Sequence, residues 1–263
     1  MLDDRAQPHT EQLAGHELDW PTELALSWPD GPRLSRLLFL HLSNMGTAMN
    51  ISRYLLPIAV ILSAPLHADD QPPTINGCVI QPESKCANAD LRGADLSNQD
   101  MRKMDLTGAD LTGANLRHAN LDLANLEKAN LTGATLTRAS LQQANLRLAN
   151  FTDAQLVAIQ GWGLFAQAAR FNGANLTAAN LEFARLSGAK LHSANLTAAN
   201  LEMTWLSKAD LDHANLTDAN LQEGKLNDAN LGNATLTGAR RHYATFQGSN
   251  MDGCFDCPVD WEK

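Results

Sequence analysis

From Leu91 to Met251 an apolar residue recurs at every fifth position, with polar residues around it in a fixed order. We number each five-residue frame by this apolar residue, called the centre. The stretch then holds 33 frames, with Leu at 25 centres, Phe at three and Met at two. Only Gly161, Ala166 and Arg241 break the pattern. The residue two places before the centre, called the small inner position, is Ala in 26 of the 33 frames.

A period of five matches neither the 3.6-residue period of a helix nor the 2-residue period of a strand. It fits a chain that turns a corner every five residues, with a short extended piece between corners. Because side chains alternate along an extended chain, the centre and the small inner position both point inward. The face position between them and the first and second corner positions after the centre point outward. The pattern therefore predicts a solenoid filled by alternating large and small side chains.

The tandem phrase A(D/N)LXX resembles the pentapeptide-repeat proteins, and the resemblance covers about 160 of the 263 residues. It implies an all-β fold, a right-handed quadrilateral parallel β-helix in which four frames make one coil. Thirty-three frames would then make about eight coils. At about 4.8 Å between stacked strands, the rod would be on the order of 40 Å long.

The segment before the repeats has two parts. Residues 1–48 show no repeat, and we interpret them as an upstream extension outside the mature protein. Residues 49–68 combine a short basic start, an apolar run and small residues before Asp69, which is typical of a secretory signal peptide. A buried element of an N-terminal domain is the alternative, and a membrane span is disfavoured because the run is shorter than about 20 residues. The rest divides into an N-terminal cap, the β-helix and a C-terminal cap or tail: 69–88, 89–252 and 253–263.

The four cysteines lie outside the repeats, two before them and two after. A disulfide requires Cα atoms within about 7 Å of each other, and a rod of about 40 Å would separate the two pairs. We therefore expect Cys78–Cys86 and Cys254–Cys257. Solenoid ends need caps, and a disulfide-closed loop is a suitable cap in an oxidising compartment.

Charge and motifs exclude several classes of function. From Asp69 onward the chain holds 16 Lys and Arg against 22 Asp and Glu, and such an acidic surface argues against a nucleic-acid ligand. We find no nucleophile–base arrangement, phosphate loop or metal motif, so no catalytic, cofactor or metal site is predicted. His192 and His213 fall on adjacent coils and could share a metal, but two His without carboxylate or thiolate company are more typical of a plain surface.

Residues twenty apart in sequence should stack on one another, and two outward columns then gather aromatic, Met and cationic residues. Arg185 next to Trp205 predicts a cation–π contact, and the composition is typical of a binding patch. The alternative is that large residues cover a loosely packed interior near Thr204 and Gly224. The predicted interaction patch consists of Trp162, Phe165, Phe183, Arg185, Met203, Trp205, Lys225 and Tyr243.

The repeat is irregular over 157–170, where Gly161 and Ala166 occupy centres and bulky Ile159 and Leu164 occupy small inner positions. This segment is either an inserted loop or a distorted coil. The five-residue phase is kept across it, which favours a distorted coil that bulges outward around Gly161.

We therefore expect an exported, non-catalytic scaffold in the bacterial periplasm or outside the cell, binding a protein partner or a second copy of itself. After signal cleavage no transmembrane segment is expected. The resemblance also suggests an alternative, a DNA-mimicking protein that protects a type II topoisomerase (gyrase). The signal peptide argues against this alternative, because an exported protein would not meet a cytoplasmic topoisomerase. A structural, envelope-associated rod is the third possibility.

Overall fold

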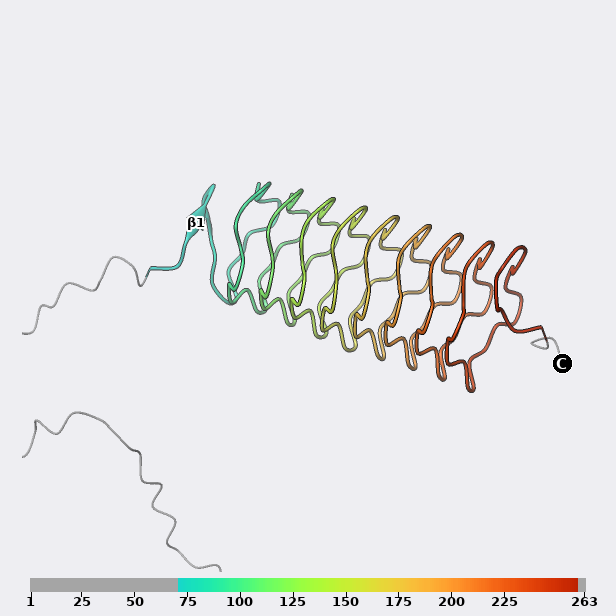
Figure 1. Ribbon diagram of the computed structural model, residues 1–263. Coiled ribbons are helices and arrows are strands. Elements are labelled where there is room, and N and C mark those ends of the chain that lie inside the picture. Colours follow the sequence, from blue (N-terminus) through green and yellow to red (C-terminus); the bar gives the residue numbers. More distant parts are fainter. Residues whose placement is uncertain (1–70, 260–263) are drawn as a thin grey trace, which may run out of the picture. The chain divides into compact units, whose positions relative to one another are not determined.

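The computed structural model describes residues 71–259, which form one rod of stacked coils (Figure 1). The predicted upstream extension, 1–48, and signal peptide, 49–68, lie outside the described residues. Between residues 71 and 259 no helix is long and apolar enough to cross a bilayer.

Parallel bridges join face positions that are twenty residues apart. They run from Lys85 paired with Asp105 to Thr235 paired with Phe255. Four frames therefore complete one coil, as the sequence predicts. Each frame contributes a single bridge instead of a longer strand, because the chain turns a corner after every five residues.

Each corner is a tight turn with a left-handed residue. The small inner N–H donates to the carbonyl of the preceding centre, as from Ala94 to Leu91 at 3.1 Å. The second corner residue has a positive φ at every fifth position from Glu83 to Gly253, which is typical of a type II turn. Many of these residues are not glycine, and this conformation costs each non-glycine residue about 1–2 kcal/mol. The coil geometry is therefore imposed by contacts between coils.

Backbone hydrogen bonds along the rod supply those contacts. The centre N–H of Leu196 donates to Asn215 at 2.7 Å, on the following coil. The face N–H of Asn195 donates to Ala174 at 2.9 Å, on the preceding coil. Because the same bonds recur from frame to frame, the backbone groups of the interior find partners in neighbouring coils.

Asparagine at the face position links the corner to the next coil. The Asn200 Oδ1 accepts the backbone N–H of Glu202 at 3.3 Å and the Nδ2 of Asn220 at 3.0 Å. The Asn200 Nδ2 donates in turn to the Oδ1 of Asn180 at 3.3 Å. An aspartate can only accept, so it caps the corner without donating to its neighbour. This explains why the repeat favours Asn or Asp between Ala and Leu.

The interior contains the centres and small inner positions, as predicted. The Leu and Ala residues at these positions are almost all fully buried. Phe151 and Phe171, one coil apart, stack with ring centroids 5.0 Å apart and planes within 8°. The alternating sizes fill the rod in the way that the pattern predicts.

The irregular segment 157–170 continues the coil. Gly161 donates its N–H to Asn180 at 2.7 Å, and Gly163 keeps the positive φ of a second corner residue. The prediction of a coil is correct, but the predicted outward bulge is wrong. The reason is that large and small residues have exchanged positions. Leu164 and Ile159 are buried in the small inner positions, and Leu164 fills the space beside Gly161, where a Cβ would lie 2.5 Å from Leu164 Cδ2.

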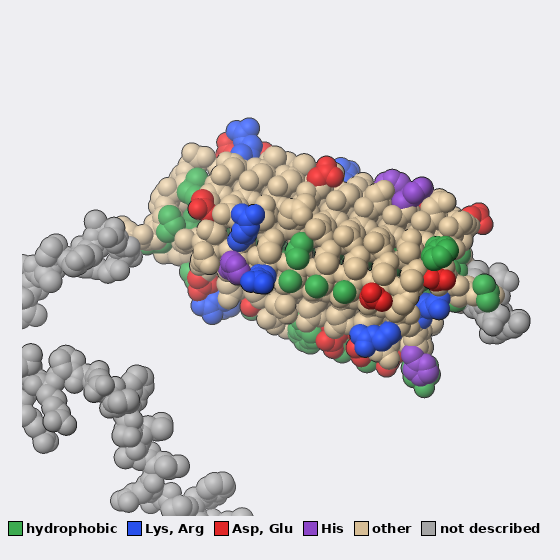
Figure 2. Space-filling model, in the orientation of Figure 1, with side chains coloured by type: hydrophobic (Ala, Val, Ile, Leu, Met, Phe, Trp, Pro, Cys, Tyr) green, Lys and Arg blue, Asp and Glu red, His purple; other side chains and the backbone are tan. Residues whose placement is uncertain are grey.

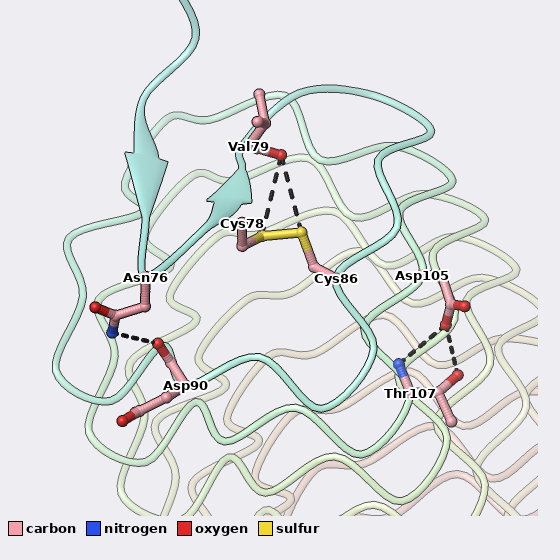
Figure 3. The surroundings of a disulfide bond; sticks show 7 residues. All are labelled: Asn76, Cys78, Val79, Cys86, Asp90, Asp105 and Thr107. Atoms are coloured by element: carbon pink, nitrogen blue, oxygen red, sulfur yellow. Dashed lines mark hydrogen bonds between the residues drawn. A yellow bond between two sulfur atoms is a disulfide. The ribbon is translucent and has the colours of Figure 1, made fainter.

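A short hairpin covers the N-terminal end. Strands β1 (Thr74–Ile75) and β2 (Cys78–Val79) pair antiparallel around Asn76-Gly77. Cys86 is buried at a centre position of the first coil and is bonded to Cys78, with 5.4 Å between the Cα atoms (Figure 3). The Asn76 Nδ2 donates to the Asp90 carbonyl at 2.8 Å, so that the hairpin is fixed to the coil.

The chain also folds over the C-terminal end. Cys254 is bonded to Cys257, with Cα atoms 5.8 Å apart. Arg241, at a centre, donates to the Asp256 carbonyl at 2.6 Å, and Thr237 donates to the Asp256 carboxylate at 2.7 Å. Both predicted disulfides are thus present, one at each end of the repeats.

A charge placed inside the rod should destabilise it far more than one placed outside. Leu196→Lys would bury an unpaired ammonium between coils, which should cost more than about 4 kcal/mol. Thr197→Lys, at the adjacent first corner position, should cost less than about 1 kcal/mol. Thermal melts of both variants test this, and equal melting temperatures would contradict the orientation of the frame.

The asparagine ladder should contribute measurably to stability. Asn200→Ala removes three hydrogen bonds and should cost about 1–3 kcal/mol. Gln160 occupies the same column and makes no side-chain bond to another coil, so Gln160→Ala serves as the control. Denaturant melts that show the same loss for both variants would rule out a special role for the ladder.

Candidate functional site

Cations and aromatic rings alternate along one face of the rod. Phe165, Arg185, Trp205 and Lys225 occupy consecutive coils and are joined by parallel bridges. The Arg185 Cζ lies 5.1 Å from the Phe165 ring centroid and 5.3 Å from that of Trp205. The Lys225 Nζ lies 5.0 Å from the Trp205 centroid. The predicted contact between Arg185 and Trp205 is therefore one part of a longer stack.

Arg147 extends this stack by one member, with its Cζ 5.3 Å from the Phe165 centroid. Arg147 is not part of the predicted patch, because it is a first corner residue and does not belong to the face column. We call these five residues the cation–aromatic stack. Each contact at an exposed site is worth about 0.5–1 kcal/mol.

Among the residues that the structure describes, the cations of the stack have no acidic neighbour at ion-pair distance. Within residues 71–259, none of the salt bridges involves Arg147, Arg185 or Lys225. The Trp205 side chain is 46% exposed between two of them. The stack therefore presents positive charge and a large apolar surface together on a chain of net charge −9.

The rest of the predicted patch lies at the neighbouring corner. The rings of Trp162 and Phe183, both exposed, meet edge to face with centroids 5.8 Å apart. Met203 is half-buried on the next coil. Tyr243 is 74% exposed two coils further on, and its ring contacts His242, with 3.8 Å between centroids. The structure therefore places Tyr243 at the margin of the patch.

A family model described as pentapeptide repeats matches the chain in eight copies, over residues 89–127, 129–157, 174–212 and 214–253. The chain belongs to the pentapeptide-repeat family. The matched segments leave out 158–173, which is the irregular coil with Gly161 at a centre. In this segment the structure keeps the geometry of the repeat, although the residue types that are typical of the family are missing.

Solved structures of other pentapeptide-repeat proteins resemble this one in part. HetL from the cyanobacterium Nostoc, involved in regulating heterocyst differentiation, is 29% identical, with 66% of this chain and 87% of HetL covered and a TM-score of 0.43. A pentapeptide-repeat protein from the thylakoid lumen of Arabidopsis thaliana is 30% identical, over 35% of this chain and 66% of its own, with a TM-score of 0.33. QnrB1, a plasmid-mediated fluoroquinolone resistance protein, is 21% identical, over 65% and 88%, with a TM-score of 0.31. None of the curated proteins matches significantly.

The interior of this pentapeptide-repeat protein is closely packed at the two small inner positions that the packing alternative concerns, Thr204 and Gly224. Thr204, in a small inner position, is buried and donates its hydroxyl to the Leu181 carbonyl at 2.9 Å. At Gly224, a Cβ would already lie 3.0 Å from the Leu221 carbonyl oxygen. Large outward residues are therefore not needed to cover a void at these positions, which favours the binding patch over the packing alternative.

A small cavity lies inside the rod near the irregular coil. It measures about 10 Å³ and is lined by apolar side chains, Leu164 and Phe171 among them. Such a space holds at most one water, and its apolar walls offer that water no partner. Binding by this pentapeptide-repeat protein is therefore expected on its surface.

The aspartates at the face positions of the first coils already accept hydrogen bonds from residues of their own corners. Asp90 accepts from the Arg92 guanidinium at 2.8 and 2.7 Å, and these hydrogen bonds lower the pKa of Asp90 to about 2. Asp105 accepts the N–H and hydroxyl of Thr107 (Figure 3). On the face shown in Figure 2, acidic and basic side chains are spaced over a mostly neutral surface. The cation–aromatic stack is therefore the stronger candidate for a binding site.

Proposed function

We propose that this pentapeptide-repeat protein is an exported, non-catalytic scaffold, a right-handed rod of about eight coils, that binds another protein or a second copy of itself through the interaction patch. The observation that carries the proposal is the cation–aromatic stack, in which Trp205 is exposed between two cations that have no acidic partner within residues 71–259.

The chemistry of the stack indicates what the partner presents. Trp and Arg at the centre of a patch are the side chains that most often dominate protein–protein affinity. Arg185 and Lys225 would accept carboxylates, and the Trp205 ring would accept an apolar or aromatic surface. The side chains are already ordered by their contacts with one another, so binding would cost less conformational entropy than it would for isolated long side chains.

Two features support export. Residues 49–68 have the pattern of a signal peptide. Disulfides at both ends of the repeats are typical of proteins outside the reducing cytoplasm. We therefore place the protein in the periplasm or outside the cell.

Truncating the central ring should weaken association and leave the fold intact. Trp205→Ala should lose about 2 kcal/mol of binding, or about 30-fold in Kd. Because the side chain points outward, the free energy of unfolding should fall by no more than about 1–2 kcal/mol, the contribution of its two cation–π contacts. Leu148→Ala, which truncates an apolar side chain 52% exposed at another corner, is the matched control.

Self-association would be measured by sedimentation equilibrium, and binding to another protein by cross-linking in the native host followed by titration of the purified pair. If Trp205→Ala associates as the wild type does and melts much earlier, then the residue serves corner packing and the proposed patch is wrong.

Export is tested separately by the mature N-terminus. Mass spectrometry of protein from the native host should find a chain that begins near Asp69, in the periplasmic or extracellular fraction. An intact chain from Met1 in the cytosol would contradict export and favour the topoisomerase-protection alternative.

A further inference from the structure

Two histidines and an aspartate converge at one corner of the rod. His192 and Asp212 are stacked first corner residues of adjacent coils, and His213 follows Asp212 in the chain. The Asp212 Oδ2 lies 3.0 Å from the Nδ1 of His213 and 3.3 Å from the Nδ1 of His192. The potential ligand atoms of all three residues lie within 4.8 Å of one another.

These spacings match those of a metal's ligands. Zinc binds imidazole nitrogen and carboxylate oxygen at about 2.0–2.2 Å, so that tetrahedral ligands lie about 3.3 Å apart. The two distances from the Asp212 oxygen are already close to this value, and both imidazoles direct a nitrogen at that same oxygen. Two His and one carboxylate are also a common ligand set for divalent transition metals.

The surroundings of Asp212 orient its carboxylate. The Asn233 Nδ2 donates to Asp212 Oδ1 at 3.2 Å, which leaves Oδ2 directed at the imidazoles. At Gly232, a Cβ would lie 2.9 Å from the same Oδ1, so the absence of a side chain there leaves room for it. A hydrogen-bonded second oxygen is the usual arrangement for a ligating carboxylate.

The backbone beneath the three side chains is fixed by the coils. His213 donates its N–H to Gly232 at 2.8 Å, and Ser193, next to His192, donates to Asp212 at 2.9 Å. The three Cα atoms are therefore already in place, and an ion would need to order only the side chains. Half-exposed imidazoles leave the remaining coordination positions open to water.

We propose that His192, Asp212 and His213 form a binding site for one divalent transition-metal ion of the Zn²⁺, Ni²⁺ and Cu²⁺ class. Four frames per coil put this corner diagonally opposite the corner that holds Phe183 and Met203. The metal site and the interaction patch are thus on different sides of the rod, and each can be tested without the other.

The test is calorimetric titration of the untagged mature protein with Zn²⁺, after removal of metals with a chelator. We expect one ion per chain, and an affinity at least about tenfold lower in His213→Asn and Asp212→Asn. Asparagine tolerates the left-handed backbone of a second corner residue, so the fold should persist, as circular dichroism would verify. His118 has the same position in its frame and the same positive φ, and His118→Asn is the matched control that should bind as the wild type does.

Two results would overturn the proposal. One is a wild-type affinity no higher than that of the double variant His192→Asn/His213→Asn. The other is an equal loss of affinity in His118→Asn, which would indicate binding by any surface imidazole.

Discussion

Hydrogen bonding between coils, repeated at twenty-residue separations, is the interaction on which the rest of this structure depends. A five-residue frame buries two side chains and cannot form a core alone. It also places a residue with positive φ at every corner, most often without the help of glycine. Only the backbone bonds to the coils before and after it, together with side-chain bonds such as Asn200 to Asn180, make that conformation favourable. The stability of each coil therefore comes from its neighbours, as expected for a solenoid.

The sequence predicted the architecture because inside and outside follow directly from the frame. Leu at the centre and Ala at the small inner position leave one register in which both are buried, and the structure has that register. The disulfides followed because only nearby cysteines can pair. The N-terminal hairpin was not predicted, although Asn76-Gly77 is a strong turn signal, because each of its strands has only two residues and shows no alternating pattern. Size compensation at Gly161 by Leu164 was also missed, since it requires knowing that both side chains enter the same layer.

The surface was predicted less completely than the interior, and for a physical reason. Stacking at twenty residues gives neighbours within a column, which is enough to place Arg185 over Trp205. Contacts between a face column and a corner column depend on the reach of each side chain. Arg147 therefore reaches Phe165 without a signal in either column alone. His192 and Asp212, in contrast, are twenty residues apart in one corner column, and His213 follows Asp212 in the chain, so the sequence contains this cluster although the prediction considered only the two histidines. Long side chains that cross from a corner to a face are where such predictions need the structure.

The irregular coil has a consequence for how the length of this chain can vary. Two successive centres carry Gly and Ala in place of a large apolar residue, but the frame count through them is unchanged, and every column beyond continues on the same side of the rod. Loss or gain of twenty residues would shorten or lengthen the rod by one coil and keep all columns aligned. Loss of a single frame would instead rotate everything after it by a quarter turn. If the lost frame lay between Arg185 and Trp205, these two residues would no longer stack, whereas Trp205 and Lys225 would stay twenty residues apart and keep their contact. Changes of residue type are thus absorbed locally, whereas a change of one frame would shift every later column to another side of the rod.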